Sequence, residues 1–165
     1  ANFVNAIRFC HGDKIFLCDQ DDVWLPDKVK RVMEAFDEGA DLVLHNAYVT
    51  DAQLNITEYS FFNKRGSKKG VLHNIMKNSY MGCCMAFDKK LLKYIMPMPK
   101  HIPMHDQWIG LMGEIYGKVK FIDMQLIYYR VHGENVTGGE TSFKQKMQWR
   151  RYLVSKLYKR VITGK

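Results

Sequence analysis

Residues 16–26 read FLCDQDDVWLP and place Asp19, Asp21 and Asp22 directly after an apolar segment. Residues 14–18 (KIFLC) are apolar at successive positions, which predicts a strand buried on both faces. Unpaired carboxylates a few ångströms apart raise each other's pKa, so this turn is unfavourable on purely structural grounds. A bound Mg²⁺ or Mn²⁺ would remove the conflict, because both ions prefer oxygen ligands shared with phosphate and water.

A structural alternative is that the acidic turn serves only the helix that follows it. Apolar spacing predicts a helix over residues 26–38, opened by Pro26 and ended by Gly39. Asp22 or Asp27 would then cap this helix, and the remaining carboxylates would be solvated. A D-x-D pair alone is weak evidence for a metal. The setting strengthens it, because an apolar strand, D-x-D-D, an aromatic residue and a proline-opened helix follow one another.

The composition indicates one globular domain. The chain has 165 residues, of which 47% are hydrophobic and 25% charged, so a packed core is expected. No apolar run approaches the roughly 18–20 residues of a membrane span, and the first residues do not resemble a signal peptide. The four cysteines form no C-x-x-C pair, which argues against zinc. Cys10 and Cys18 are expected to pack as small hydrophobes, which favours a reducing, cytoplasmic location.

The formal net charge of +8 has two interpretations. It would suit a nucleic acid or an anionic membrane as partner, or it reflects only a basic solvated surface and tail. Basic residues are spread along the chain and concentrate only at residues 64–69 and 144–160. No nucleic-acid-binding motif is present and the aromatic residues are not interleaved with the basic stretches, so we expect no nucleic-acid partner.

Strands alternate with helices along the chain, which predicts an α/β domain with a mostly parallel sheet and flanking helices. In such sheets, ligands gather at the carboxyl ends of strands, where the acidic turn lies. Residues 51–69 look irregular. The predicted strands are 14–18, 41–49, 80–87 and the segments KVKFID and QLIYYRV; the predicted helices are 2–10, 26–38, 70–78, 88–95, 105–117 and 142–162.

Several segments resemble one protein family. FLCDQDDVWLPDKV closely resembles the acidic motif of family 2 glycosyltransferases, which are inverting sugar transferases of the GT-A fold. NSYMGCCMAFDKKLL resembles the acceptor-side strand of that family, and HDQWIGLMGEIYGKVKFID resembles its helix that opens with an acidic catalytic residue. YYRVHGENVTG resembles the segment that carries a late histidine.

The resemblance implies roles for individual residues. Asp21 and His132 would bind Mn²⁺ or Mg²⁺, and Asp19 and Asp22 would face the sugar-nucleotide donor. Asp106 would act as the general base, with a contribution of typically ~10²–10⁴-fold. The family's activity further implies a nucleotide-diphosphate sugar as donor and a saccharide or a lipid-linked molecule as acceptor, in the synthesis of a cell-surface polysaccharide.

Three residues are candidates for the acceptor side, and each has a structural alternative. Gly82 would allow a substrate close to the backbone, or would mark a strand bulge. Trp24 would line the site, or would pack under the acidic turn. His105 would shape the site, or would be a solvated neighbour of Asp106. By spacing alone, Asp106 is the N-cap of its helix and His132 an ordinary turn histidine.

The chain also departs from the family pattern. The strand-turn-helix half that binds the nucleotide base is not visible, so we expect residues 1–141 to be the C-terminal portion of a GT-A domain, truncated at its N-terminus. A sheet edge left unpaired in this way would favour self-association. The activity of the isolated chain would be low, and an inactive remnant that serves as a binding module is the alternative.

Residues 142–165 are predicted to form a separate basic, amphipathic helix. Such a helix would lie on an anionic membrane surface, at the inner face of the membrane, or would dock on the rest of the enzyme. The sequence pattern leaves these two alternatives open.

Overall fold

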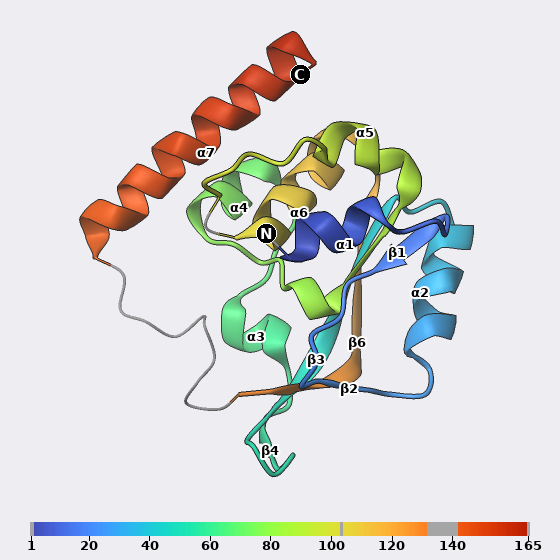
Figure 1. Cartoon of the computed structure of the whole chain (residues 1–165). Helices are drawn as coiled ribbons and strands as arrows, with labels where there is room; N and C mark the ends of the chain where they lie inside the picture. Colours follow the sequence, from blue (N-terminus) through green and yellow to red (C-terminus); the bar gives the residue numbers. More distant parts are fainter. Residues whose placement is uncertain (1, 103, 132–141, 165) are drawn as a thin grey trace.

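The sheet and its helices form one α/β unit in the computed structural model, which describes residues 2–102, 104–131 and 142–164 (Figure 1). Six strands form one sheet in the order β1-β5-β3-β6-β2, with β4 paired to β3. The strands are β1 (Lys14–Phe16), β2 (Val23–Trp24), β3 (Leu42–Thr50), β4 (Ile56–Glu58), β5 (Met85–Asp88) and β6 (Val119–Arg130). The helices are α1 (Asn2–Arg8), α2 (Lys28–Asp37), α3 (Phe61–Arg65), α4 (Val71–Met76), α5 (Leu92–Ile95), α6 (His105–Tyr116) and α7 (Phe143–Thr163), with short 3₁₀ turns η1 (Gly82–Cys84) and η2 (Lys89–Leu91).

The predicted α/β class with flanking helices is confirmed, and the sheet itself is mixed. β3 and β6 pair in parallel, whereas the other described pairings are antiparallel. β1 and β3 are each antiparallel to β5, so β1, β3 and β6 run in one direction. The alternation of strands and helices correctly predicts that shared direction. It does not reveal that β5 is inserted between β1 and β3 in the opposite direction, because η1 leads the chain into the sheet from the other end.

Helices cover both faces of the sheet, and the strands present alternate residues to them (Figure 1). On one face, Leu42 and Leu44 of β3 join the larger core with buried residues of α6, including Trp108. On the other face, Val43 packs with the apolar side of α2, including Phe36. Trp108 is fully buried.

The largest differences from the predicted elements lie in three segments. KVKFID and QLIYYRV form one long strand, β6, whose pairing with β3 shifts register partway along. Residues 51–69 are more ordered than expected, because they contain β4 and α3. The predicted strand at 80–87 starts only at Met85, since Gly82–Cys84 turn as a 3₁₀ helix.

The cysteines are all free, but only part of their expected packing is correct. Cys83 and Cys84 are buried and Cys10 is half-buried, whereas Cys18 is exposed. The prediction for Cys18 was wrong because side chains alternate along an extended chain. Ile15 and Leu17 point into the core, so Cys18 points outward.

Candidate functional site

The acidic turn, residues 19–22, lies between β1 and β2 and is held at both ends by neighbouring strands. Before it, the backbone N–H of Leu17 donates to the Met85 carbonyl of β5 at 3.0 Å. After it, β2 pairs with β6, and the backbone N–H of Arg130 donates to Asp22 Oδ1 at 3.1 Å. The turn is therefore positioned by the sheet and does not depend on capping α2. Asp27 is the N-cap residue of α2 by position, and its side chain makes no capping hydrogen bond.

Asp19 and Asp22 converge on Cys83. One carboxylate oxygen from each aspartate and the Cys83 sulfur all lie within 4.8 Å of one another. Burial raises the pKa of Asp19, the charge of Asp21 raises it further, and the charge of Lys28 opposes both. Ionised carboxylates are thus disfavoured here unless a cation joins them.

Asp22 is affected by burial in the same way. Burial raises its pKa, and the charges of Asp19 and Asp21 add to the increase. The neighbouring Cys83 thiol and a hydrogen bond from the Arg130 N–H oppose the increase. Even so, Asp22 Oδ2 is buried and makes no hydrogen bond of good geometry within the described residues. A buried oxygen in this state is unusual in a folded protein and suits an atom that receives a ligand.

Not every predicted ligand can be placed. Asp21 is half-buried within the same turn, but the described group of close ligand atoms consists of Asp19, Asp22 and Cys83. His132 lies outside the described residues, so its pairing with Asp21 stays a prediction.

Lys28, at the start of α2, is a buried residue of the site that the sequence analysis did not single out. Its side chain is 1% exposed, its Nζ donates to the Cys83 carbonyl at 2.8 Å, and it lies 3.8 Å from the centre of the Trp24 ring. Burial lowers its pKa, while the nearby Cys84, Cys83, Cys18 and Asp22 raise it. The proline-x-lysine pattern after the acidic turn is the signal that would have found it.

Cys83 and Cys84 form a buried pair beneath the acidic turn. Burial by itself raises the pKa of Cys84, but a hydrogen bond from Cys83 and the positive charges of His45 and Lys28 lower it to about 6. The pKa of Cys83 is raised, chiefly because its thiol donates to Cys84 and because it is buried. Lys28 therefore lies beside the Cys84 sulfur, whose pKa is lowered, and beside the aspartates of the turn.

Asp106 is the candidate carboxylate outside the acidic turn, and it is not the N-cap of its helix. α6 begins at His105 and its N-cap position is Met104. Burial raises the pKa of Asp106, although the charge of His105 and the N–H groups of Gln107 and Gly82 oppose the increase. The N-terminal position on a helix predicts easy ionisation, but burial is the larger influence, and it makes this carboxylate a better proton acceptor.

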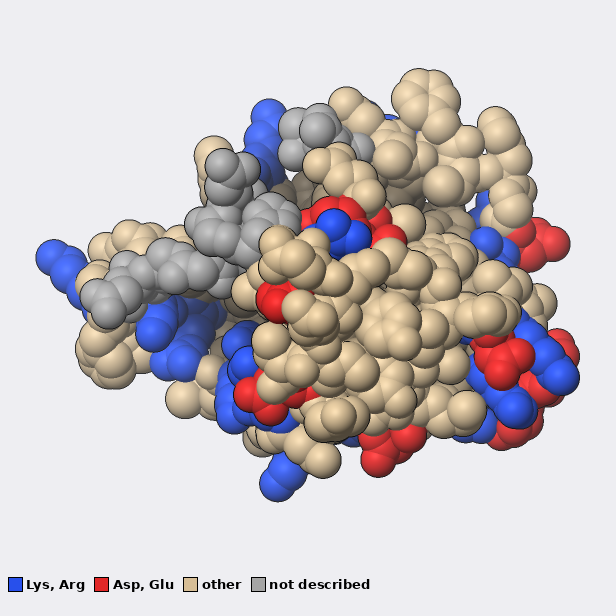
Figure 2. Space-filling model, turned by 90° about the horizontal axis from the view of Figure 1, so that it is seen from below, with Lys and Arg blue, Asp and Glu red and all other residues tan. Residues whose placement is uncertain are grey.

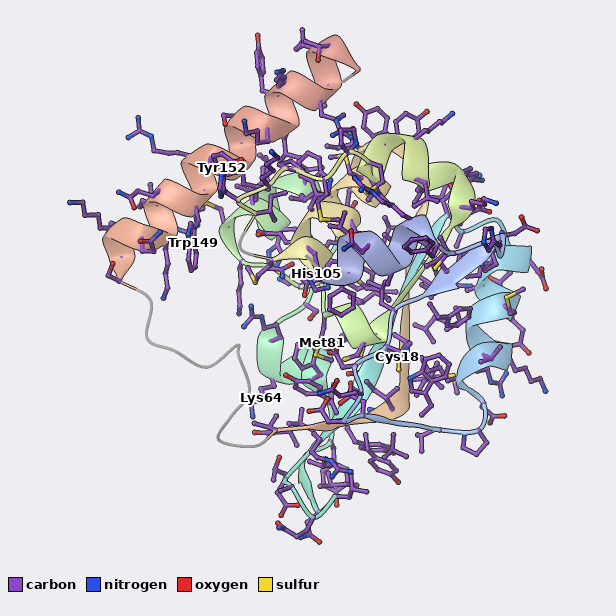
Figure 3. The ribbon with its side chains drawn as sticks, viewed as in Figure 1. Cys18, Lys64, Met81, His105, Trp149 and Tyr152 are labelled. Atoms are coloured by element: carbon purple, nitrogen blue, oxygen red, sulfur yellow. The ribbon has the colours of Figure 1, made fainter. Side chains whose placement is uncertain are left out.

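His105 and Gly82 meet beside Asp106. A Cβ atom added at Gly82 would lie 3.3 Å from His105 Nε2 and 4.0 Å from the Asp106 Cβ, so the glycine allows close approach here. The His105 ring stacks on Phe3 with centroids 4.0 Å apart, and burial lowers its pKa. Its Nε2 is buried without a hydrogen-bond partner among the described residues. Figure 3 labels Met81, which directly precedes Gly82, and His105, which begins α6.

Trp24 lies in β2, which follows the acidic turn directly. Its ring is 6.0 Å from Phe16 and covers the Lys28 ammonium, so the aromatic side packs beneath the turn. The indole Nε1 is buried and has no partner within the part of the chain that the structure describes. The ring's position corresponds to the packing alternative.

Two consecutive residues connect the two acidic regions. A Cβ atom added at Gly82 would lie 4.0 Å from the Asp106 Cβ, and the Cys83 sulfur lies within 4.8 Å of an Asp22 carboxylate oxygen. The 3₁₀ turn η1 thus lies between the Asp106 carboxylate and the carboxylates of the acidic turn. Such an arrangement can remove a proton on one side and neutralise a departing anionic group on the other.

Comparison with known proteins defines the class. The sequence model of glycosyl transferase family 2 matches residues 1–96, which include the acidic turn, Gly82 and Cys83. The chain belongs to this family. An uncharacterized glycosyltransferase of Nostoc sp. (strain PCC 7120) is 25% identical over 133 residues, which cover 75% of this chain. The match covers 41% of that relative, so the chain spans about two fifths of its length.

Proposed function

We propose that this chain carries the metal- and acceptor-binding side of an inverting glycosyltransferase. The reaction would transfer a sugar from a nucleotide-diphosphate sugar to an acceptor hydroxyl. The observation that supports this proposal best is η1, where Gly82 lies beside the proposed base Asp106 and the Cys83 sulfur lies within 4.8 Å of carboxylate oxygens of the acidic turn. The family assignment supports the same chemistry.

The acidic turn fits a divalent cation such as Mn²⁺ or Mg²⁺. Its close carboxylates have pKa values raised by burial and like charge, and Asp22 keeps a buried oxygen without a good hydrogen bond. Asp19, Asp21 and Asp22 would hold the ion, with His132 as the further ligand that the resemblance implies. When bound, the ion would supply positive charge to the diphosphate leaving group.

Asp106 would act on the acceptor. Its carboxylate takes the proton of the acceptor hydroxyl while that oxygen attacks the anomeric carbon. The bond between this carbon and the diphosphate oxygen breaks on the opposite face, so the anomeric configuration inverts. The buried environment raises the pKa of Asp106 and favours proton uptake. His105 Nε2, which has no described partner, lies where it would hydrogen-bond an acceptor hydroxyl.

The broader role is also a proposal. A saccharide or lipid-linked acceptor in cell-surface polysaccharide synthesis agrees with the resemblance. β1 is an edge strand that pairs only with β5 within the described residues. A further strand could pair with its other edge, which supports the expected portion of a GT-A domain that binds the nucleotide. Self-association is another way to cover that edge.

The experiment measures Mn²⁺ binding by isothermal titration and sugar transfer with a panel of nucleotide-diphosphate sugars, with product configuration read by NMR. We expect metal-dependent donor binding, release of nucleoside diphosphate and an inverted anomeric centre. Asp37→Asn, at the exposed end of α2, is the matched control and leaves both readouts unchanged.

The outcomes separate the alternatives. A product that retains the anomeric configuration contradicts the single displacement. Metal-dependent donor binding without turnover, even by a longer form of the protein that includes a nucleotide-binding segment, identifies a binding module. The absence of any metal-dependent binding by that longer form contradicts the whole proposal.

A further inference from the structure

The C-terminal helix α7 attaches to the body of the protein through one of its faces. Leu153 and Leu157 are buried, and the Arg160 guanidinium donates to the carbonyls of Tyr94, Met96 and Pro97 around the end of α5. Farther toward the start of the helix, the Arg150 Nη2 donates to the Met76 carbonyl at the end of α4 at 2.6 Å. These contacts fix the rotation of α7 about its own axis, so its outward-facing residues are defined.

An apolar stripe runs along the side of α7 that lies next to its docked face. At 3.6 residues per turn, five of its residues fall within an arc of roughly 60° and follow one another along the helix. Their exposed fractions are large for apolar side chains, at 76% for Phe143, 38% for Met147, 45% for Val154, 69% for Tyr158 and 50% for Val161.

The stripe continues onto α4. Arg150 contacts both the Met147 sulfur, at 3.7 Å, and the Met76 carbonyl, so the two helices meet beside the stripe. On α4, Leu72 is 81% exposed and Met76 is 60% exposed. An exposed apolar surface built from two elements indicates a binding partner more strongly than scattered single residues do.

Basic residues border this surface. Lys144 and Arg151 follow the apolar stripe on its outer side, and Arg150 borders it on the side of α4. Residues 142–164 contain no aspartate or glutamate. Figure 2 shows lysine and arginine side chains gathered on the left, at the end of the molecule where α7 begins. Trp149 and Tyr152 come from the same half of the helix (Figure 3).

We infer that this face of α7 and α4 binds the surface of an anionic lipid bilayer. An interfacial helix of this kind inserts its apolar stripe among the headgroups and pairs its basic borders with anionic lipids. A second copy of the chain fits less well, because it has the same basic borders and a net charge of +8. Surface binding of this kind needs no transmembrane segment, and no described helix is long and apolar enough to be one.

The test is co-sedimentation of the chain with phosphatidylcholine vesicles that contain or lack phosphatidylglycerol, without metal or sugar donor. A failure of the proposed catalysis therefore leaves this measurement unaffected. We expect binding to the anionic vesicles only, weakened by salt. Replacing Lys144 and Arg151 by glutamine should lower the affinity about fivefold each, or roughly 25-fold together. The matched control replaces Lys30 and Lys118, two exposed lysines outside this face, and should change it little.

A second pair of variants tests the apolar stripe. Phe143→Ser with Tyr158→Ser should lower binding about tenfold or more, because each side chain is exposed in the free protein and buried only at the bilayer. Val29→Ser, at a similarly exposed valine of α2, is the control, and circular dichroism verifies folding. Three results would overturn the inference. They are equal binding to neutral and anionic vesicles, no binding to either kind of vesicle, and equal losses of binding in the test and control variants. Dimerisation that depends on Phe143 and Tyr158 would overturn it as well.

Discussion

The acidic turn and Asp106 differ in what surrounds their carboxylates. Burial raises the pKa in both regions. In the turn, neighbouring aspartates raise the pKa values of Asp19 and Asp22 further. Around Asp106, the charge of His105 and two backbone N–H groups lower the pKa and favour the ionised form. The turn therefore suits an added cation, whereas Asp106 is surrounded by groups that suit a base, which must lose and regain a proton.

The largest expected effect separates the two regions through catalysis. Asp106→Asn should lower the rate of transfer by ~10²–10⁴-fold, because the acceptor hydroxyl loses its proton acceptor. The same variant should bind Mn²⁺ as the unmodified protein does, since Asp106 lies outside the acidic turn. Transfer rates and calorimetric metal titration on one preparation test both halves of this prediction. An unchanged rate would remove Asp106 from the mechanism, and a lost metal site would show that the two regions are one.

A second prediction concerns the metal-free protein and its stability. A carboxyl group whose pKa is raised in the folded state contributes stability at low pH, and this contribution is lost as pH rises through the folded pKa. Asp19→Asn removes that loss, so it should raise the melting temperature of the metal-free protein at neutral pH. The gain should shrink as pH falls toward 3.8, the ordinary value for this carboxyl.

The measurement is thermal unfolding across this pH range, with and without Mn²⁺. Added Mn²⁺ should stabilise the unmodified protein and have a much smaller effect on the variant. Asp37→Asn serves again as the control, because Asp37 is exposed and distant from the turn. A variant less stable than the unmodified protein at neutral pH would show that Asp19 has a structural role that outweighs its electrostatic cost.

The sequence predicted the acidic turn better than it predicted what lies around it. The apolar strand and the proline-opened helix are local patterns, and the structure contains both as β1 and α2. The proximity of Cys83 to Asp22 is not local, because these residues are far apart in the chain and meet only when β5 enters the sheet beside β1. No periodicity in a single sequence reveals the insertion of an antiparallel strand.

The buried polar groups were equally difficult to predict. Lys28 is a polar residue at the start of an amphipathic helix, and lysine is seldom fully buried. An exposed side chain was therefore the simpler expectation. Its burial depends on the Cys83 carbonyl and the Trp24 ring, which come from two other segments. Asp106 was expected at the start of a helix, but its raised pKa depends on burial by the rest of the fold.

The smallest expected effect tests how far Lys28 influences the acidic turn. Its charge lowers the pKa of Asp19, so Lys28→Met should raise that pKa further. Because protons compete with metal ions for carboxylate oxygens, Mn²⁺ binding by the variant should begin at a higher pH than in the unmodified protein. Mn²⁺ titrations at a series of pH values measure this shift, with Lys30→Met, an exposed lysine of the same helix, as the control.

Coincident curves for Lys28→Met and the unmodified protein would mean that the lysine acts only through its hydrogen bond to Cys83. The variant would then lose about 1–3 kcal/mol of stability for the unpaired carbonyl and leave metal binding unchanged.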